Sequence, residues 1–215
     1  MSDIVLASNS PRRRELLSLL GFEFVADPAD IDESQLSGES PPDYVSRLAW
    51  EKAQAIAARR SGLVIAADTI VVDGEELLGK PQDELDAWRM LLQLRGRTHQ
   101  VYTGLAILDS RTGESFIDIC RTDVPMRNYS EDEIEAYIAS GDPMDKAGAY
   151  AIQHAGFHPV EGLTGCFASV MGLPLCHLVV GLQQFGFSIP EDLGIRCQAV
   201  FNYVCPALEA ILGQA

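Results

Sequence analysis

The chain has 215 residues, of which 47% are hydrophobic and 22% charged, and a chain of this size and composition buries a full core as one large domain or two closely packed lobes. Its formal net charge of −15 argues against a general nucleic-acid binder, because such a protein needs an extended basic surface. No apolar run reaches the roughly 18 to 20 residues of a membrane span, and residues 1–3 show no basic flank or cleavage-type segment. We therefore expect a cytoplasmic protein with no membrane or nucleic-acid partner, in which any phosphate site is local.

The five cysteines are odd in number and include no Cys-x-x-Cys pair, so neither a disulfide framework nor a zinc site is indicated. We expect reduced, mostly packed thiols. The four histidines show no close metal-ligand spacing, and the chain contains no Gly-x-Ser-x-Gly or P-loop pattern. The sequence therefore assigns no catalytic histidine and no serine nucleophile.

Apolar runs and helical patterns open the chain. Residues 4–7 are typical of a buried strand, and Ser10 and Pro11 are the candidate N-cap and first residue of a helix that ends at Gly21. Residues 27–42 are acidic and rich in Ser and Pro, which favours a loop over a site. The first unit is therefore predicted to be a strand, a tight turn and a helix.

The same alternation continues along the chain. The predicted elements are a helix at 42–60, a strand at 63–67 that ends at Asp68 and Thr69 and is continued by 70–72, a turn at 73–74, a helix at 84–94, strands at 99–109 and 114–126, a capping-box helix at 131–139, short strands and loops up to 175, and a helix through 182. Strands that alternate with helices predict an α/β fold with a mixed sheet. Such folds place ligand chemistry at strand ends and in the loops that leave them.

Two arginines, Arg12 and Arg13, fall in the first turn of the first predicted helix. The free N–H groups of a helix start already favour an anion, so bare cations are unfavourable there. A bound polyphosphate resolves this conflict. The alternative interpretation is a solvent-facing basic helix start.

Three further residues carry charges suited to phosphate chemistry. Asp68 directly follows the apolar run 63–67, where α/β proteins place working residues, and it can bind a metal or orient water. A turn-capping Asp is an equally good interpretation. Lys52 and Lys80 have the reach to neutralise phosphate oxygens, and a flanking Gly and Pro make the Lys80 loop stiff and accessible. Either lysine can also be an ordinary surface residue.

Two acidic segments are less specific. Glu33 lies in the acidic loop and is a candidate magnesium ligand, because that ion prefers carboxylate and water oxygens; most acids of this loop are expected to be simply solvated. Residues 142–150 place acidic, basic and small side chains in one compact loop. An ordinary salt-bridged loop is the alternative to a functional one.

Motifs over roughly residues 3 to 183 resemble, in their order, the Maf family of nucleotide pyrophosphatases. They are Leu6-Ala7-Ser8-x-Ser10-Pro11-Arg12-Arg13, Arg47-Leu48-Ala49-x-x-Lys52-Ala53, Ala67-Asp68-Thr69-x-Val71, Gly79-Lys80-Pro81, Gly96-Arg97-x-His99-x-Val101-x-Thr103-Gly104, Asp145-Lys146-Ala147-Gly148-Ala149-Tyr150-x-Ile152-Gln153 and Gly172-Leu173-Pro174. The resemblance implies a two-lobed α/β fold, with an elongated mixed sheet flanked by helices and a deep cleft, shared with the inosine triphosphate pyrophosphatases. We predict a Maf-like nucleotide pyrophosphatase domain at 1–187 and a C-terminal helical extension at 188–215.

The resemblance also implies roles for single residues. Asp68 matches the family's catalytic acidic residue, taken as the proton acceptor that activates water. Arg13, Lys52 and Lys80 match its phosphate-binding cations. Glu33 and Asp68 are the expected ligands of a divalent metal, Mg²⁺ with Mn²⁺ as the alternative. The implied reaction is attack of water on the α-phosphorus with pyrophosphate leaving.

Ser8 matches a position that lines the cleft, and Arg12, Thr69 and Gln153 match the branch that hydrolyses dTTP and UTP. The resemblance implies a cytoplasmic hydrolase of nucleotide metabolism, a dTTP/UTP pyrophosphatase that acts on a nucleoside triphosphate, with housekeeping of non-standard nucleotides as a role; many such proteins form homodimers. One alternative is 7-methyl-GTP hydrolysis, which Thr69 and Gln153 disfavour. The other is a nucleotide-sensing regulator of cell division or septum formation that binds without turnover and does not need Asp68.

Overall fold

A six-stranded sheet forms the centre of the structure, a computed structural model that describes residues 4–206. The strands are β1 (Ile4–Leu6), β2 (Phe24–Ala26), β3 (Leu63–Asp73), β4 (Glu76–Leu78), β5 (Thr98–Asp109) and β6 (Ser115–Pro125). The helices are α1 (Pro11–Ser18), α2 (Pro41–Ala57), α3 (Glu84–Leu94), α4 (Glu131–Ala139), α5 (Phe167–Val170), α6 (Leu175–Gln184) and α7 (Leu193–Phe201), and two 3-10 turns are η1 (Asp142–Asp145) and η2 (Ala147–Ala149). Hydrogen bonds join the strands in the order β2-β1-β3-β5-β6, with β4 beside β3.

The sheet is mixed, as the sequence predicts. β1 is parallel to β2 and β3, whereas β3, β5 and β6 are antiparallel neighbours. On the side of β3 away from β5, β1 pairs as far as Ile65 and β4 pairs only from Val71 onward. Residues 66–70 of β3 are therefore open on that side, and this gap in the sheet is where the site lies.

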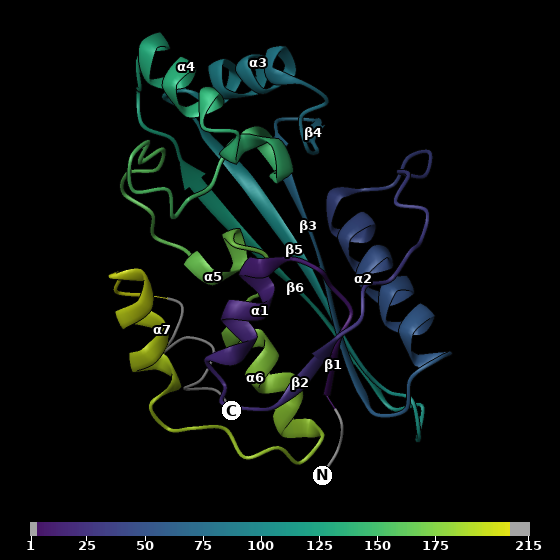
Figure 1. The fold of residues 1–215 in the computed structure, drawn as a ribbon. Coiled ribbons are helices and arrows are strands. Elements are labelled where there is room, and N and C mark those ends of the chain that lie inside the picture. The colour runs from purple at the N-terminus through teal and green to yellow at the C-terminus, as the bar shows by residue number, and fades with distance from the viewer. Residues whose placement is uncertain (1–3, 207–215) are drawn as a thin grey trace.

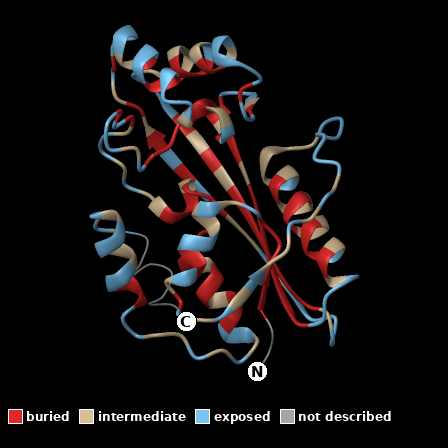
Figure 2. Cartoon of the chain, viewed as in Figure 1, coloured by how far each residue is buried: buried red, intermediate tan, exposed pale blue. Residues whose placement is uncertain are grey.

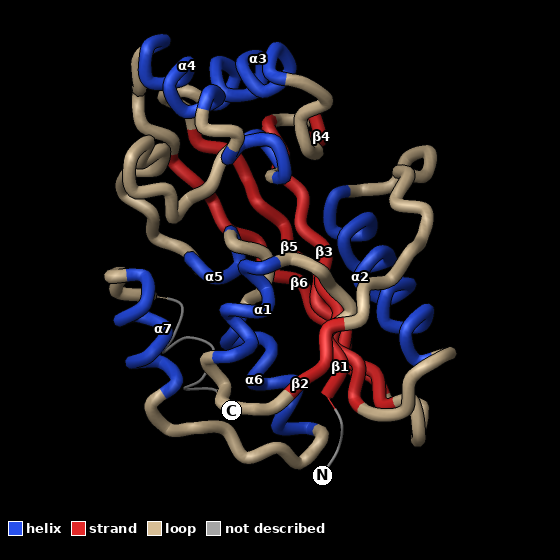
Figure 3. Tube along the Cα trace, in the orientation of Figure 1, coloured by secondary structure: helices blue, strands red, loops and turns tan. Residues whose placement is uncertain are grey.

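The helices surround the two ends of the long strands. Figure 1 shows α3 and α4 together at one end, and α1, α6 and α7 around the other. The tube in Figure 3 places α2 on the opposite side of the sheet from α1 and α6. This arrangement is the two-lobed α/β fold with a long mixed sheet that the sequence predicts.

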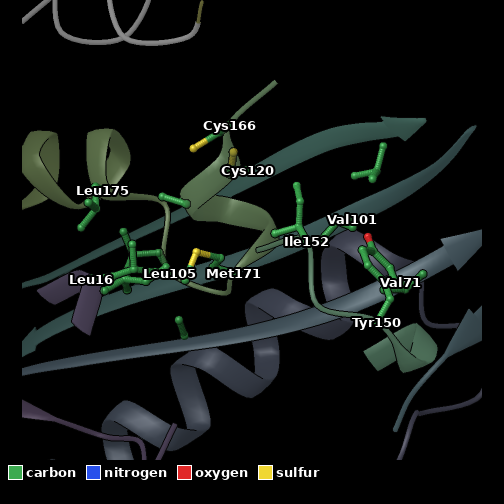
Figure 4. Packing of buried hydrophobic residues seen from close by; sticks show 14 of the residues in the cluster. Leu16, Val71, Val101, Leu105, Cys120, Tyr150, Ile152, Cys166, Met171 and Leu175 are labelled. Atoms are coloured by element: carbon green, nitrogen blue, oxygen red, sulfur yellow. The ribbon is translucent and has the colours of Figure 1, made fainter. Parts of the chain in front are cut away.

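Successive residues of β3 face opposite sides of the sheet, as in any strand. Val64 belongs to the cluster that α2 covers, whereas Ile65 belongs to the larger cluster that includes α1 and α6. Figure 2 shows the strands buried between the helices, and Figure 4 shows part of the larger cluster. The same alternation turns Asp68 towards α2 and Thr69 towards α1.

A glycine lets α2 approach the sheet closely. Gly104 of β5 is the register partner of Asp68. A Cβ on Gly104 would lie 2.3 Å from the backbone oxygen of Val45 in α2, a distance that side chains do not tolerate. The missing side chain therefore allows α2 to bring Lys52 over Asp68.

The structure confirms several predicted elements. α3 and α4 begin and end at the predicted residues, and the capping box of Ser130 and Glu133 is present. Ser10 caps α1 and Pro11 opens it. Among residues 4–206, no helix has both the length and the apolar character needed to cross a bilayer.

Other expectations are wrong. Asp68 does not end a strand, because β5 pairs with β3 on both sides of it and β3 continues to Asp73. The sequence does not predict β2 and β4, which have three residues each and are too short to show a period. Residues 142–172 contain η1, η2 and α5 instead of short strands. α7 lies within the segment 188–215 that we predict to be a helical extension, and residues 207–215 of that segment lie outside the described residues.

We predict that Gly104→Ala lowers the free energy of unfolding by about 3 kcal/mol, because the added Cβ overpacks against the α2 backbone. Urea denaturation measures this change. Gly79→Ala is the control, since no atom lies within 4 Å of its added Cβ, and it should change the free energy by less than about 0.5 kcal/mol. Equal stability of the two variants would contradict the close approach of α2.

Candidate active site

A cavity of about 580 Å³ opens beside the unpaired part of β3. The loop after β1, the start of α1, the loop after β4, η1 and the residues after η2 and α5 form its walls. The residues that the sequence selects all line it: Ser8, Arg12, Arg13, Glu33, Lys52, Asp68, Thr69, Lys80 and Gln153. The structure thus brings them together, and their individual roles stay predictions.

The turn between β1 and α1 is held by its own serines. Ser8 is buried, and its Oγ accepts hydrogen bonds from the Ser10 backbone N–H at 3.1 Å and from Arg13 Nη1 at 3.4 Å. Ser10 Oγ accepts from the Arg13 backbone N–H at 3.4 Å. The turn therefore fixes the helix start and the arginine that follows it.

Arg13 reaches across the cavity from α1 to β3 and α5. Its Nε donates to the Gly172 carbonyl at 2.8 Å and its Nη2 donates to Thr69 Oγ1 at 3.2 Å. Burial lowers the pKa of Arg13, and the charge of Asp68 opposes this effect. The guanidinium is thus hydrogen-bonded only by neutral oxygens, those of Gly172, Ser8 and Thr69.

Thr69 continues this set of contacts into the sheet. Its Oγ1 lies 3.1 Å from Thr103 Oγ1, and Thr103 Oγ1 donates to the Ser169 carbonyl at 2.9 Å. Thr103 is fully buried. Hydrogen bonds therefore link Arg13, by way of Thr69 and Thr103, to Ser169 of α5.

Lys52, Asp68 and Glu33 form an ion cluster on the α2 side. The Lys52 Nζ lies 2.6 Å from Asp68 Oδ1 and 2.6 Å from Glu33 Oε1. Burial raises the pKa of Asp68, while Lys52 and Arg13 act in the opposite direction; the net effect is a raised pKa. Tyr44 Oη of α2 donates to the Glu33 carbonyl at 2.8 Å, which ties the acidic loop to the helix.

The carboxylates of the cavity are too few to bind a divalent metal alone, and oxygen atoms of a bound substrate would have to complete the coordination. Among residues 4–206, no three His, Cys, Asp or Glu side chains are grouped as a metal site. Glu33 and Asp68 do converge on one cation, the Lys52 ammonium. Because Mg²⁺ commonly uses one or two carboxylates with water and phosphate oxygens, these two residues fit a metal that a polyphosphate helps to hold.

Ion pairs brace the loop that contains η1 and η2, part of which lines the cavity. Lys146 Nζ lies 2.6 Å from Asp145 Oδ1 and 3.0 Å from Asp142 Oδ1. Arg12 Nη1 of α1 lies 3.3 Å from Asp145 Oδ2. Arg12 therefore connects α1 with the other wall of the cavity.

Lys80 and Gln153 stand at the rim. The Gly79 carbonyl accepts from the Gly148 N–H at 3.0 Å, so the Lys80 loop is fixed to η2. Gln153 is exposed and lines the cavity. Both side chains are thus accessible to a ligand from solvent.

Sequence reasoning assigns no role to His99 and Tyr150, although both occur in the motifs. His99 is fully buried, and its Nε2 lies 2.8 Å from Tyr150 Oη. Burial lowers the pKa of His99 to about 4, so the imidazole is neutral. Tyr150 lines the cavity, and its hydrogen bond with His99 therefore fixes this part of the cavity wall.

We predict that Lys52→Met raises the pKa of Asp68 further, because Lys52 supplies the strongest of the effects that lower it. Carboxyl ¹³C shifts of the metal-free protein, followed against pH, measure this. Lys80→Met is the control, since Lys80 lines the same cavity but is not among the groups that act on Asp68. An unchanged titration of Asp68 in Lys52→Met would contradict the ion pair.

Comparison with known proteins identifies the family. The family model described as Maf-like protein matches residues 3–185. The dTTP/UTP pyrophosphatase of Geotalea uraniireducens (strain Rf4) is 48% identical over 86% of this chain and 96% of that protein. The dTTP/UTP pyrophosphatase of Desulforamulus reducens is 45% identical over 88% of this chain and 100% of that protein. A solved HAM1 protein from Coxiella burnetii is 18% identical, with a TM-score of 0.44 over 60% of this chain and 75% of that chain. On the family match and these identities, the chain belongs to the Maf family.

Proposed function

We propose that this chain is a nucleoside triphosphate pyrophosphatase that hydrolyses dTTP and UTP to the nucleoside monophosphate and pyrophosphate. The observation that carries the proposal is a buried carboxyl group, Asp68, beside two cations in a cavity of about 580 Å³, within the range of small-molecule sites. Similarity to proteins named for this activity supports it. A cytoplasmic location, a magnesium cofactor and a homodimer complete the proposal.

Asp68 is the proposed base. In this scheme its carboxylate orients a water molecule and takes a proton from it as the water attacks the α-phosphorus. A raised pKa makes a carboxylate a stronger base near neutral pH. Burial is the cause of the raised pKa here, so the same packing that hides Asp68 prepares it for proton transfer.

The cations act on the charge of the triphosphate. Arg13 and Lys80 both line the cavity, and Lys52 can exchange a carboxylate for a phosphate oxygen. Such fixed charges stabilise the charge that builds on the transferred group and on the leaving pyrophosphate. A divalent metal held by Glu33 and Asp68 supplies further positive charge to the phosphate oxygens when it is bound.

The rim residues are the proposed readers of the base. Gln153 offers an amide donor and acceptor at the exposed rim of the cavity. A base with the wrong pattern leaves such groups unpaired, which costs affinity. Thr69 and Arg12 are the other residues assigned to the choice of pyrimidine.

We predict that Asp68→Asn lowers kcat for pyrophosphate release by at least about 10²-fold, the usual contribution of a general base, while the binding of dTTP persists. Stopped assays of pyrophosphate and calorimetric titration measure the two quantities. Asp145→Asn is the matched control, because this carboxyl group also lines the cavity but is 61% exposed. A fully active Asp68→Asn protein would remove Asp68 from the reaction.

We also predict that dTTP and UTP are hydrolysed faster than CTP, ATP, GTP and 7-methyl-GTP, and that a chelator stops turnover. Pyrophosphate release with Mg²⁺, with Mn²⁺ and with chelator tests this. A preference for 7-methyl-GTP would assign the other branch of the family. Binding of these triphosphates without turnover would favour the alternative function, a nucleotide-sensing regulator of cell division or septum formation.

A further inference from the structure

The segment that carries Gln153 to the rim of the cavity has no regular structure of its own. Residues 150–158 contain no helix and no strand, so individual contacts decide where this segment lies. The backbone N–H of His154 donates to the Ala151 carbonyl at 3.1 Å. Gln153 therefore lies inside a tight turn, and whatever holds the ends of this turn also holds Gln153.

Tyr137 of α4 contacts the turn on both sides of Gln153. Its Oη accepts a hydrogen bond from the Ala151 backbone N–H at 2.9 Å. Its ring packs edge-on against His154, with the centroids 4.7 Å apart, and stacks on Phe157, with the centroids 4.3 Å apart. One side chain thus holds the turn before and after the residue at the rim.

The helix places Tyr137 where its hydroxyl group needs protein partners. The buried residues of α4 are Ile134, Tyr137 and Ile138, at the spacings of three and four that form one helix face. Tyr137 is 3% exposed and does not line the cavity. A tyrosine hydroxyl group buried in this way is expected to hydrogen-bond to the protein instead of water.

The hydrogen bonds of this hydroxyl group have a defined direction. Because Oη accepts from Ala151, its own proton lies on the contact of 2.7 Å to Asp142 Oδ2. Burial raises the pKa of Tyr137, and Asp142 adds to this effect, so the group keeps its proton. Loss of Oη leaves the buried Ala151 N–H without its acceptor, which is unfavourable.

Asp142 links Tyr137 to Arg12 through ion pairs. Asp142 Oδ1 lies 3.0 Å from Lys146 Nζ, which lies 2.6 Å from Asp145 Oδ1. Asp145 Oδ2 lies 3.3 Å from Arg12 Nη1. Lys146 is buried, but the Asp145 side chain is 61% exposed. Solvent weakens an exposed ion pair, so Arg12 is held less firmly than the turn of Gln153.

We propose that Tyr137 is a positioning residue for nucleobase selectivity, which holds Gln153 and, through Asp142, also Arg12. The inference rests on the proposed function, which assigns Gln153 and Arg12 to the choice of pyrimidine. A glutamine amide presents a donor and an acceptor, so it rejects a wrong base only while its backbone stays in place. Tyr137 does not line the cavity and acts only through these residues.

The test compares Tyr137→Phe with the unaltered full chain. Phenylalanine keeps the ring contacts and loses only the hydrogen bonds of Oη. The measured quantity is the ratio of kcat/KM for dTTP to kcat/KM for CTP, from pyrophosphate release with Mg²⁺ on one preparation. We expect this ratio to fall about tenfold, through a higher KM for dTTP more than through a lower kcat. The fraction of folded protein cancels in the ratio, so lower stability alone leaves it unchanged.

Tyr129→Phe is the matched control. Tyr129 is buried like Tyr137, and its ring also packs against Phe157, with the centroids 4.7 Å apart. Its Oη donates to the Leu91 carbonyl of α3 at 2.7 Å, away from the turn. We expect the ratio to change by less than about twofold in this variant. Equal falls in the two variants would refute a specific role of Tyr137.

Hydrogen exchange of the ligand-free protein tests the contact itself. We expect the Ala151 amide to exchange at least about tenfold faster in Tyr137→Phe than in the unaltered chain, and to exchange at the unaltered rate in Tyr129→Phe. An equal rate in all three proteins would refute the hold of Tyr137 on the turn.

Asp142→Asn takes the place of Tyr137→Phe if that variant does not fold. It keeps the size of the side chain, but removes the charge that strengthens the hydrogen bond from Tyr137 and the ion pair with Lys146. We expect it to lower the ratio about threefold.

The outcomes separate this inference from the function on which it rests. A selective unaltered chain whose ratio does not change in the variant would refute the role of Tyr137 alone. An unaltered chain that releases no pyrophosphate, or that hydrolyses CTP as well as dTTP, would instead refute the proposed function.

Discussion

The site depends on one interaction, the ion pair between Lys52 and Asp68 in a nearly dry place. Each partner alone would be costly to bury, since an unpaired charge loses its hydration without compensation. The pair forms only because α2 packs closely against β5, so that the Lys52 side chain reaches Asp68. Gly104, the register partner of Asp68, makes this close packing possible. The end of β1 at Leu6 then leaves this part of β3 open to a ligand.

The sequence predicts the long helices and strands and the residues that line the site. It predicts less well how these residues are placed relative to one another. Long amphipathic and alternating runs predict α3, α4, β5 and β6, because their periods extend over many residues. The length of β3 and the position of Asp68 within it are not predictable in this way, because a charged residue after an apolar run indicates the end of a strand. The contact of Glu33 with Lys52 joins segments far apart in the chain, and local patterns carry no information on it.

The chain is strongly acidic as a whole, yet several basic side chains line its cavity: Arg12, Arg13, Lys52, Lys80 and Lys146. Lys52 is held by carboxylates, whereas Arg13 is held by a carbonyl and hydroxyl oxygens. The first cation is therefore largely neutralised until a ligand competes for it, and the second keeps its full charge. Because the charge of Lys52 is neutralised by carboxylates, the repulsion between the two buried cations is weak and does not destabilise the fold.

The hydrogen bonds that run from Arg13 into the sheet have a fixed direction. Arg13 can only donate to Thr69, and Thr103 uses its single hydroxyl proton on the Ser169 carbonyl, so the Thr69 proton must point to Thr103. Thr69 Oγ1 therefore has only a lone pair left for a ligand. A ligand atom that meets Thr69 Oγ1 therefore has to carry a hydrogen, and under the proposed function the ring N–H of uracil and thymine meets this requirement.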